Sequence, residues 1–425
     1  MCTINSSVSS GRAMDPQGSS SLLLSGGWVA LNASATVRAD LEISNGRIVR
    51  LIDRGRKEHG PERVNANEGR AEISVEGCLI LPGLINSHDH LEFNLFPRLG
   101  RGPYPNFEKW ADDIFHPEAS PICEQLAIPK PVRLWWGGLK NLLSGVTTVC
   151  HHNEYEKSVF GAEFPVHVVK RYGWAHSLRY GNNVREAFLS TPRGAPFIIH
   201  LAEGSDAQSG DEIFDLDRLG ALDARTVIVH GVGLTERGHE LRRQRGAALV
   251  WCPTSNRFTL GATLDAAGLG AQDRIALGSD SALTAEGDLL DEIRAAHSEG
   301  MDPGQIYSMV TGSATDVLRL RNGEGKLQPG SNADLLVVKR RDLSPAEVLI
   351  STRLDSIEMV MVSGQPHLVS ARMAVGCPPH LLNGFEDIDV EGTSCSVRAP
   401  VRQLLTDPLA CLGAEVRLAG KRVSP

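Results

Sequence analysis

The sequence lacks several features that mark specialised classes of protein. No apolar run approaches the roughly 20 residues that a helix needs to span a bilayer, and the eight cysteines are scattered without a CxxC pair. This spacing provides neither a zinc–thiolate site nor a dense disulfide framework. Acidic residues outnumber basic ones, 51 to 43, and the formal net charge is −8. We therefore expect no membrane span and no general binding of nucleic acid, which would need a basic face.

The N-terminal stretch also lacks a secretion signal. MCTINSSVSSGRAMDPQGSS is rich in Ser and Gly, and it has no basic start followed by an apolar core. We interpret residues 1–20 as a disordered leader. Because no export signal is found, we expect reduced thiols and a cytoplasmic location.

Two kinds of pattern alternate along the chain. Residues 21–77 contain short β-type runs, and Asn45-Gly46 is a hairpin signal because both residues tolerate a positive φ. From residue 78 onward, apolar runs of four to eight residues alternate with helical stretches, which predicts βα units around a parallel sheet. Near-continuous apolar strands indicate burial on both faces, as in a closed barrel or a doubly wound sheet. After about residue 325 the strand pattern returns, so both chain ends can form one small β-rich domain.

Two histidines follow one of these strands, in LPGLINSHDHLEFN. Residues two apart in a strand point to the same side, so His88 and His90 can converge on one point. Two neutral imidazoles that share a point often hold a metal ion. For this pair alone, the alternative is two partly buried histidines whose nitrogens bond neighbouring carbonyl groups.

Three other strands end in similar residues. PFIIHLAE contains His200 and Glu203, TVIVHGVGL contains His230, and RIALGSDS contains Asp280. The carboxyl ends of barrel strands converge on one face, where the active sites of such barrels lie. Four strands that each place a histidine or a carboxylate at this face are difficult to explain by packing alone, and they predict a catalytic site.

As a set, these motifs resemble the amidohydrolase superfamily, in particular the aminohydrolase and chlorohydrolase branch of cytosine, guanine and S-adenosylhomocysteine deaminases and triazine hydrolases. The resemblance covers about residues 21–375 and includes LPGLINSHDHL, LLSGVTTV, HLAE, IVHGVGL, WCPTSN, ALGSDS and GEGKLQPGSNADLLVV. It implies an α/β fold with a distorted (β/α)₈ TIM barrel at residues 78–324. Residues 21–77 and 325–375 would form the small β-rich domain, and residues 376–425 would be a C-terminal extension of unknown structure.

The resemblance also implies a metal-dependent hydrolase with one divalent metal ion. The implied ligands suit Zn²⁺ and also Fe²⁺, with Zn²⁺ preferred; they are His88, His90, His200 and Asp280. By the same similarity, His230 would contact the substrate and would hydrogen-bond the metal-bound water or the attacked group.

The implied reaction is hydrolysis of a C–N bond, not a peptide bond, by a metal-bound hydroxide. Deamination of a small aminated heterocycle is the leading interpretation, with Asp280 taking a proton from the water and Glu203 protonating a ring nitrogen. An amidase, a carbamate hydrolase or a dechlorinating hydrolase on the same site is the alternative, and a non-catalytic barrel scaffold is a remote one. The expected partner is a small-molecule substrate, and a homo-oligomer is compatible with the sequence.

The chain departs from the family pattern in two places. Few residues separate His152 from Pro196, so one βα unit must be contracted, with FPVHVV and KRYGWAHS as successive minimal strands. His176 then falls where relatives carry a substrate-binding histidine, and a surface or core position is its alternative. The second strand ends in His151 and His152, and the alternation of a strand allows at most one of them to face the site.

The substrate pocket depends on loops, which vary freely on this fold. The long loop 93–131 carries residues that either contact a planar or anionic substrate or pack on one another as a lid: Arg98, Arg101, Tyr104, Phe107 and Trp110. Lys170 leaves open a carboxylated lysine between two metals, but the HxxE motif at His200 favours the one-metal branch.

Overall fold

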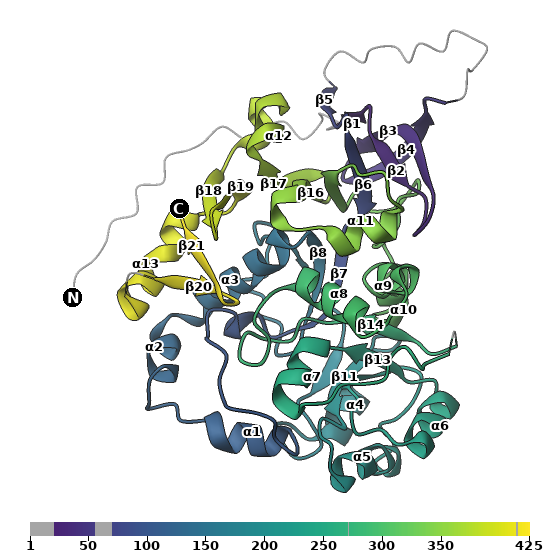
Figure 1. Ribbon diagram of the computed structural model, residues 1–425, viewed down its shortest axis with the longest axis vertical. Coiled ribbons are helices and arrows are strands. Elements are labelled where there is room, and N and C mark those ends of the chain that lie inside the picture. Colours follow the sequence, from purple (N-terminus) through teal and green to yellow (C-terminus); the bar gives the residue numbers. More distant parts are fainter. Residues whose placement is uncertain (1–20, 56–69, 271, 414) are drawn as a thin grey trace.

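The computed structural model describes residues 21–55, 70–270, 272–413 and 415–425. In Figure 1 a β-rich part lies above a mixed α/β part, and the C-terminal segment, in yellow, extends down one side toward α2. The expected leader, residues 1–20, lies outside the described residues. The expected α/β class with a separate β-rich part is confirmed.

Eight parallel strands form the core of the α/β part. Strands such as FIIHL and TVIVH are buried along their whole length, as strands that are covered on both faces require. They pair as a five-stranded sheet, β10-β11-β12-β13-β14, and a three-stranded sheet, β7-β8-β9. Their bounds are β7 (Leu84–Asp89), β8 (Val146–His151), β9 (His167–Val168), β10 (Gly173–Ala175), β11 (Phe197–Leu201), β12 (Thr226–His230), β13 (Ala248–Trp251) and β14 (Ile275–Leu277).

The two sheets meet at one seam, between β7 and the residues that follow β14. The carbonyl oxygen of His88 accepts the backbone N–H groups of Ser279 (2.9 Å) and Asp280 (3.1 Å), and Asp89 forms a parallel bridge with Asp280. On the other side, no ladder joins β9 to β10 among the described residues. The strands therefore follow the order of a barrel, but the hydrogen-bonded closure is incomplete.

The helices cover these strands, except where the chain is contracted. Only residues 169–172 separate β9 from β10, and this stretch, which is described throughout, contains no helix, as the sequence indicates. Asp206 caps the N-terminus of α5 by accepting the Ser209 N–H (2.8 Å). The helices are α1 (Phe107–Ile114), α2 (Ile122–Ala127), α3 (Lys130–Leu143), α4 (Val184–Ser190), α5 (Ala207–Arg218), α6 (Glu236–Arg245), α7 (Pro253–Leu260), α8 (Leu289–Ser298), α9 (Pro303–Met309) and α10 (Gly312–Val317).

One 13-stranded sheet contains segments from both ends of the chain. β6 (Cys78–Pro82) pairs antiparallel with β15 (Leu335–Lys339), which joins the N-terminal strands to the C-terminal ones. The Asn45-Gly46 hairpin is confirmed, with φ angles of 51° and 73° between β3 and β4. The other elements are β1 (Ser21–Ser25), β2 (Trp28–Ala30), β3 (Thr36–Ser44), β4 (Arg47–Asp53), β5 (Ala71–Ser74), α11 (Pro345–Ser351), β16 (Ile357–Val362), β17 (Gln365–Ser370) and α12 (Ala371–Gly376).

Residues 376–425, whose structure the sequence left open, extend the same sheet. They contribute β18 (Phe385–Val390), β19 (Thr393–Arg398), β20 (Val416–Leu418) and β21 (Lys421–Ser424), and α13 (Val401–Leu412) contacts α2 and α3 of the barrel. The division of the chain into domains at residues 77, 324 and 375 stays a prediction.

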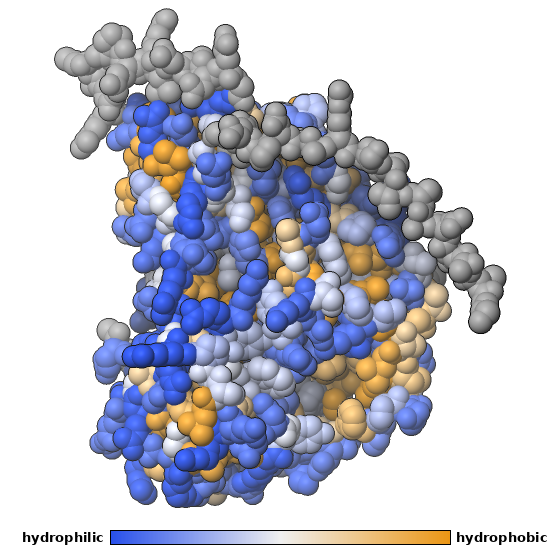
Figure 2. All heavy atoms as spheres, turned by 180° about the vertical axis from the view of Figure 1, so that it is seen from behind, coloured by the Kyte–Doolittle hydropathy of each residue, from blue (hydrophilic) through white to orange (hydrophobic). Residues whose placement is uncertain are grey.

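The molecular surface is mainly hydrophilic on the face opposite to that of Figure 1. Figure 2 shows hydrophilic residues over most of this face, with the hydrophobic residues gathered in separate patches. Among the described residues, no helix has both the length and the apolar character needed to cross a membrane.

A buried polar network lies behind the seam. Asp89, the last residue of β7, lies between His88 and His90 in the sequence and is fully buried. Its Oδ2 lies 3.0 Å from Nζ of Lys140 on α3, which is 3% exposed. Asn141 (2.7 Å) and Asn94 (2.9 Å) donate to the same carboxylate, and Lys140 also donates to Oγ of Ser279 (3.0 Å). Asp89 therefore points away from the point on which its neighbouring histidines converge, and it ties β7, α3 and the β14 end together.

Replacing Lys140 by Met should destabilise the protein by about 3 kcal/mol, because removing one partner of a buried ion pair leaves an uncompensated charge. Urea unfolding would measure the loss. The control is Lys109→Met, since the Lys109–Asp112 pair has side chains that are 62% and 71% exposed and should contribute less than about 1 kcal/mol. Equal stabilities of the two variants would contradict a structural role for Lys140.

Candidate metal and catalytic site

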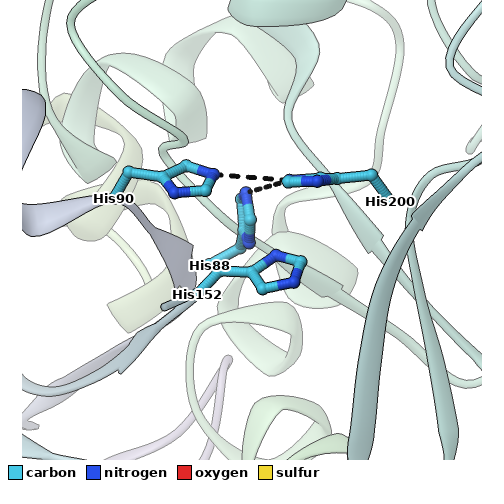
Figure 3. Close-up of side chains that lie close together, drawn as sticks. All are labelled: His88, His90, His152 and His200. Atoms are coloured by element: carbon cyan, nitrogen blue, oxygen red, sulfur yellow. Dashed lines mark hydrogen bonds between the residues drawn. The ribbon is translucent and has the colours of Figure 1, made fainter. Parts of the chain in front are cut away.

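Three histidine side chains converge at the carboxyl ends of β7 and β11 (Figure 3). The Nε2 atom of His200 lies 3.2 Å from Nε2 of His88 and 3.4 Å from Nε2 of His90. His88 belongs to β7 and His90 follows its last residue, so the strand alternation directs both rings to the same side. All three rings are buried, and the structure thus brings together the three histidines that the sequence nominated.

The three Nε2 atoms have the spacing of a metal ligand set. Zn–N bonds of 2.0–2.1 Å in a tetrahedral site place two ligand nitrogens about 3.3 Å apart. A hydrogen bond can join two neutral imidazole nitrogens, but a single proton cannot bridge three. Hydrogen bonding alone therefore does not account for the approach of all three Nε2 atoms. Nδ1 of His200 lies 2.9 Å from the carbonyl oxygen of His176 and is therefore the protonated nitrogen, which leaves Nε2 with a free lone pair. These residues fit a divalent metal ion.

Burial keeps the imidazoles in the form that binds metals. Burial lowers the pKa of His88 to about 4, and a hydrogen bond with Asp280 only partly opposes this effect. Burial and the neighbouring histidines hold the pKa of His200 well below its usual value. Both side chains are therefore neutral near pH 7, as a nitrogen ligand must be.

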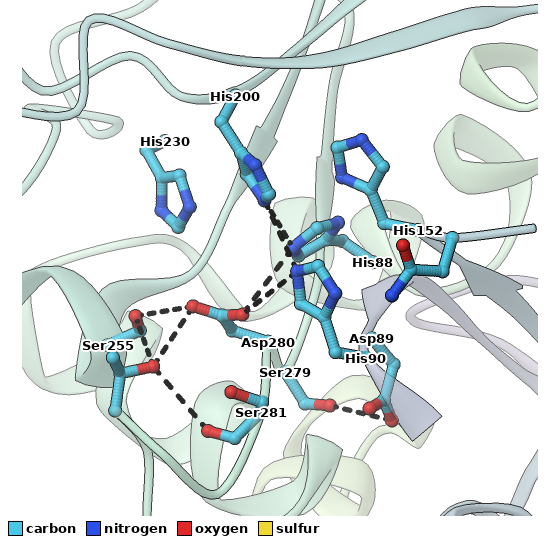
Figure 4. Close-up of polar contacts among 12 residues, drawn as sticks. His88, Asp89, His90, His152, His200, His230, Ser255, Ser279, Asp280 and Ser281 are labelled. Atoms are coloured by element: carbon cyan, nitrogen blue, oxygen red, sulfur yellow. Dashed lines mark hydrogen bonds and ion pairs between the residues drawn. The ribbon is translucent and has the colours of Figure 1, made fainter. Parts of the chain in front are cut away.

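Asp280 supplies a carboxylate to the same point. Its Oδ1 lies 3.5 Å from Nε2 of His88 and 3.8 Å from Nε2 of His90. Its Oδ2 accepts hydrogen bonds from Ser255 (2.6 Å) and Thr284 (3.1 Å), as Figure 4 shows for Ser255. Burial would raise the pKa of Asp280, but the hydrogen bond with His88 and the surrounding histidines hold it well below its usual range. The carboxylate is thus ionised and held with one oxygen toward the histidines.

His152 also faces this group, although the sequence did not assign it to the ligands. One ligand nitrogen from each of His88, His90, His152 and His200 lies within 4.8 Å of the others. Nε2 of His152 donates to the carbonyl oxygen of Ala175 (3.0 Å), and its Nδ1 is buried without a partner. His151 lies near Glu92 instead (Nε2–Oε2 3.6 Å). Only one of the two adjacent histidines faces the site, as strand alternation requires.

His230 and Glu203 form a second pair at the ends of β12 and β11. Nδ1 of His230 donates to Oδ1 of Asn256 (2.8 Å), which leaves Nε2 as an acceptor 3.5 Å from Oε2 of Glu203. Burial, together with Asp280 and Glu212, raises the pKa of Glu203 well above its usual value. The surroundings therefore favour the ionised form of Asp280 and the protonated form of Glu203, an arrangement that suits acid and base steps.

The backbone at these strand ends is strained. Ala202, His230 and Asp280 have φ angles of 54°, 72° and 52°, in the left-handed region that few residues other than glycine adopt. Such conformations concentrate at functional sites, where the surrounding structure holds them. Here they turn the chain sharply where each strand ends, at the residues that carry the polar side chains.

A cavity of about 310 Å³ opens onto this group. Aromatic and aliphatic side chains form much of its wall, and the polar groups gather around the histidines. It is lined by His90, Phe93, Phe107, Trp110, Ala111, Ile114, Phe115, Asn153, His176, Tyr180, His200, Glu203, His230, Asp280, Ser281, Leu283 and Thr284. His176 thus lies on the cavity wall, where the sequence nominated it as a substrate-binding residue.

The long loop 93–131 divides between wall and lid. Phe107 and Trp110 line the cavity, but Arg98, Arg101 and Tyr104 do not. Tyr104 contacts Asp113 and accepts the backbone N–H of Arg101 (2.8 Å), so this part of the loop packs on itself. Lys170 is exposed and lines a different hollow, so its position does not support the two-metal alternative.

Two residues of the WCPTSN motif support the site, although the sequence did not assign them roles. Ser255 donates to Asp280, and Asn256 accepts from His230. Both lie at the start of α7, directly after β13. Their position at the end of a barrel strand could have nominated them. However, Ser and Asn are common in sequences, and neither residue type alone indicates a functional role.

The family comparison matches residues 192–366 to the Amidohydrolase family. A protein named 5-methylthioadenosine/S-adenosylhomocysteine deaminase from Haloarcula marismortui is 24% identical over 393 residues, which cover 78% of this chain and 88% of the relative. A protein of the same name from Thermococcus sibiricus is 24% identical over 424 residues, which cover 81% and 93%. The resemblance inferred from the motifs is confirmed.

Solved structures share the fold. An adenosine deaminase from Xanthomonas campestris with bound zinc has a TM-score of 0.65 and 19% identity, covering 82% of this chain and 93% of that chain. An atrazine chlorohydrolase from Arthrobacter aurescens complexed with zinc has a TM-score of 0.62 and 16% identity, covering 81% and 94%. These similarities confirm the expected fold.

Proposed function

The chain carries an amidohydrolase family domain, and we propose that this metal-dependent hydrolase deaminates an adenine nucleoside or a closely related aminated heterocycle. Hydrolytic cleavage of a C–N bond is the activity that the family and the deaminase relatives support. The expected enzyme class is confirmed, and the scaffold alternative is set aside. The choice of an adenine nucleoside as the substrate goes beyond this reaction class, and it is suggested by the names of the relatives.

One observation carries the proposal. Three imidazole Nε2 atoms and the Asp280 carboxylate converge at a cavity that is also lined by Glu203, a carboxyl group whose pKa is raised by burial. We assign the metal to His88, His90, His200 and Asp280, and we propose zinc because nitrogen and oxygen ligands suit it. A divalent metal bound there would lower the pKa of a water molecule from 15.7 to about 7.

The two carboxyl groups divide the proton transfers. Burial raises the pKa of Glu203 and so favours its protonated form, which can donate a proton to a ring nitrogen of the substrate. Asp280 is ionised and can accept a proton from the attacking water and pass it to the departing amine. His230 presents Nε2 to the cavity and can accept a hydrogen bond from the attacked group or the water. The overall change is R–NH₂ + H₂O → R–OH + NH₃, in which the carbon loses its amine and gains an oxygen, and the product becomes the carbonyl form when its hydrogen lies on the ring nitrogen.

The cavity wall favours substrates without a charged tail. Within the described part of the chain, no Lys or Arg lines the cavity. Two cations that adjoin lining residues in the sequence already have acidic partners, Lys109 with Asp112 (3.1 Å) and Arg179 with Glu108 (3.4 Å). An unpaired carboxylate loses its hydration on entering such a cavity and gains no partner.

We therefore expect 5′-methylthioadenosine to be deaminated with a kcat/KM at least about tenfold higher than that of S-adenosylhomocysteine. Ammonia release from a panel of purines, pyrimidines and triazines would test the proposal. Ala111→Arg adds a cation to the cavity wall and should bring the kcat/KM values of the two substrates closer together. Leu126→Arg, on the exposed face of α2, should leave their ratio unchanged. Ammonia from pyrimidines or chloride from a chlorotriazine, with none from purines, would replace the nucleoside assignment by the alternative hydrolase.

A further inference from the structure

A second hollow, separate from the catalytic cavity, lies beside β9. Its volume is about 450 Å³, and it shares no lining residue with the catalytic cavity. It is lined by Thr148, His167, Val168, Val169, Lys170, Arg171, Gly194, Ala195, Leu318, Arg319, Leu320, Arg321, Asn322, Glu324 and Asn332. None of these residues belongs to the site described above.

The contraction of the chain explains why this hollow exists. A strand of a βα barrel is normally followed by a helix that packs over it. Only residues 169–172 follow β9 before β10 begins, so no helix of this unit covers the outside of the strand. Buried apolar side chains such as Val168, Val169 and Leu318 form part of the hollow's wall. The volume of about 450 Å³ lies in the range of small-molecule sites, so the hollow can hold a flat ring against this part of its wall.

Four cations surround this apolar wall, and none has a carboxylate partner among the described residues. They are Lys170, Arg171, Arg319 and Arg321. Elsewhere in the chain, arginines form close ion pairs, for example Arg257 with Glu299 (2.6 Å) and Arg245 with Asp217 (2.7 Å). Four cations against one carboxylate, Glu324, give the hollow an excess of positive charge in a chain with a net charge of −8, and this excess attracts anions.

The remaining charged groups of the hollow do not cancel this excess of positive charge by pairing with the cations. Glu324 is the acidic residue of the lining, and its oxygens accept from the backbone N–H (2.7 Å) and the side chain (3.0 Å) of Asn322. Nε2 of His167 lies 3.4 Å from Oδ1 of Asp334 and 3.1 Å from Oγ of Ser363, so His167 pairs with these residues and not with the four cations. Arg319 donates to the carbonyl oxygen of Ala224, but its buried Nε has no partner among the residues that the structure describes.

We propose that this hollow binds a small organic phosphate, an anion whose phosphate contacts the guanidinium groups and whose flat apolar part packs on the buried wall. Guanidinium groups donate paired hydrogen bonds to phosphate oxygens, and the apolar wall adds affinity that inorganic phosphate cannot gain. A nucleoside monophosphate has both parts. This proposal does not depend on the nature of the catalysed reaction.

Calorimetry on the full chain with uridine 5′-monophosphate, uridine and inorganic phosphate tests the proposal. Among the described residues no Lys or Arg lines the catalytic cavity. A phosphate could still bind a metal ion held there, so the charge-reversal variants below assign phosphate-dependent binding to the hollow. We expect uridine monophosphate to bind at least about tenfold more tightly than inorganic phosphate, and uridine to show no binding. The binding should weaken as the salt concentration rises, because exposed charges are screened.

Charge reversal at the exposed positions distinguishes this hollow from any other site. Lys170→Glu and Arg321→Glu should each weaken uridine monophosphate at least about tenfold, whereas Arg341→Glu, on an exposed loop outside the hollow, should not. Arg319→Gln serves as a third variant. If this substitution impairs folding, Lys170→Glu and Arg321→Glu still test the proposal, because both of those residues are exposed. No binding at 10 mM, equal affinity for uridine monophosphate and inorganic phosphate, or binding that the Lys170 and Arg321 variants leave unchanged would each overturn the proposal.

Discussion

Glu203→Gln should lower kcat at least about a hundredfold while the protein keeps its metal and its fold. The amide has nearly the same shape as the carboxyl group but cannot deliver a proton, and general acid–base groups contribute about 10²–10⁴ in rate. Glutamine can still hydrogen-bond a substrate, so KM should change much less, as expected when an interaction is lost mainly in the transition state. Steady-state kinetics of ammonia release, together with elemental analysis, would measure both quantities.

Glu212→Gln is the matched control for this variant. Glu212 also has a raised pKa, about 7, because it is buried, and it accepts the Ala202 N–H (2.7 Å), a bond that a glutamine oxygen can also accept. It does not line the catalytic cavity. Glu212 also contributes to the raised pKa of Glu203, as the smallest of three causes, but it delivers no proton to the substrate. We therefore expect kcat to fall much less than in Glu203→Gln, by less than about tenfold. A normal rate for Glu203→Gln with full metal occupancy would remove Glu203 from the mechanism.

His88→Ala should abolish stoichiometric metal binding, from about one equivalent per chain to less than about a tenth, because the three remaining ligands leave the ion underbound. Asp280→Ala should have the same effect. Inductively coupled plasma mass spectrometry of the purified, dialysed proteins would measure the metal content, and the wild type would also identify the metal.

His176→Ala provides the comparison for the ligand variants. His176 lines the same cavity but belongs to neither of the residue groups that can hold a metal. This variant should therefore keep its metal and change mainly KM. Equal metal content in the wild type, His88→Ala and Asp280→Ala would exclude the proposed ligand set.

The strand-end residues could be predicted because the signal is local. His88 and His90 lie two residues apart at the end of an apolar strand, and His200, His230 and Asp280 each end a strand of their own. Parallel strands of a barrel bring such ends to one face whatever the intervening loops do. This explains why a sequence pattern alone nominated residues that lie within a few ångströms of one another in the structure.

The remaining features depend on tertiary packing. The choice between His151 and His152 needed the register of β8, because adjacent residues face opposite sides and the sequence does not fix which side is inward. Asp89 lies between two of the proposed ligands in the sequence. Nothing in the sequence predicts that its ion-pair partner is Lys140, which lies on a helix about fifty residues later. The wall of the cavity is formed by Phe107 and Trp110 and excludes Arg98 and Arg101, a division that only the path of the loop decides. Incomplete pairing between β9 and β10 likewise has no sequence signal beyond the shortened connection.

The seam at His88 has a consequence for how the protein folds. The carbonyl oxygen of His88 accepts the N–H groups of Ser279 and Asp280, and the same residues would be joined a second time through the metal. These groups are about 190 residues apart in the chain, so the contact closes a very long loop, and its entropic cost must be met before the contact gains anything. The seam can therefore form only after the intervening strands have assembled. A bound metal should accordingly lower the unfolding rate of the protein. It should leave the rates of the early folding steps unchanged, because the contact that it stabilises has not yet formed in those steps.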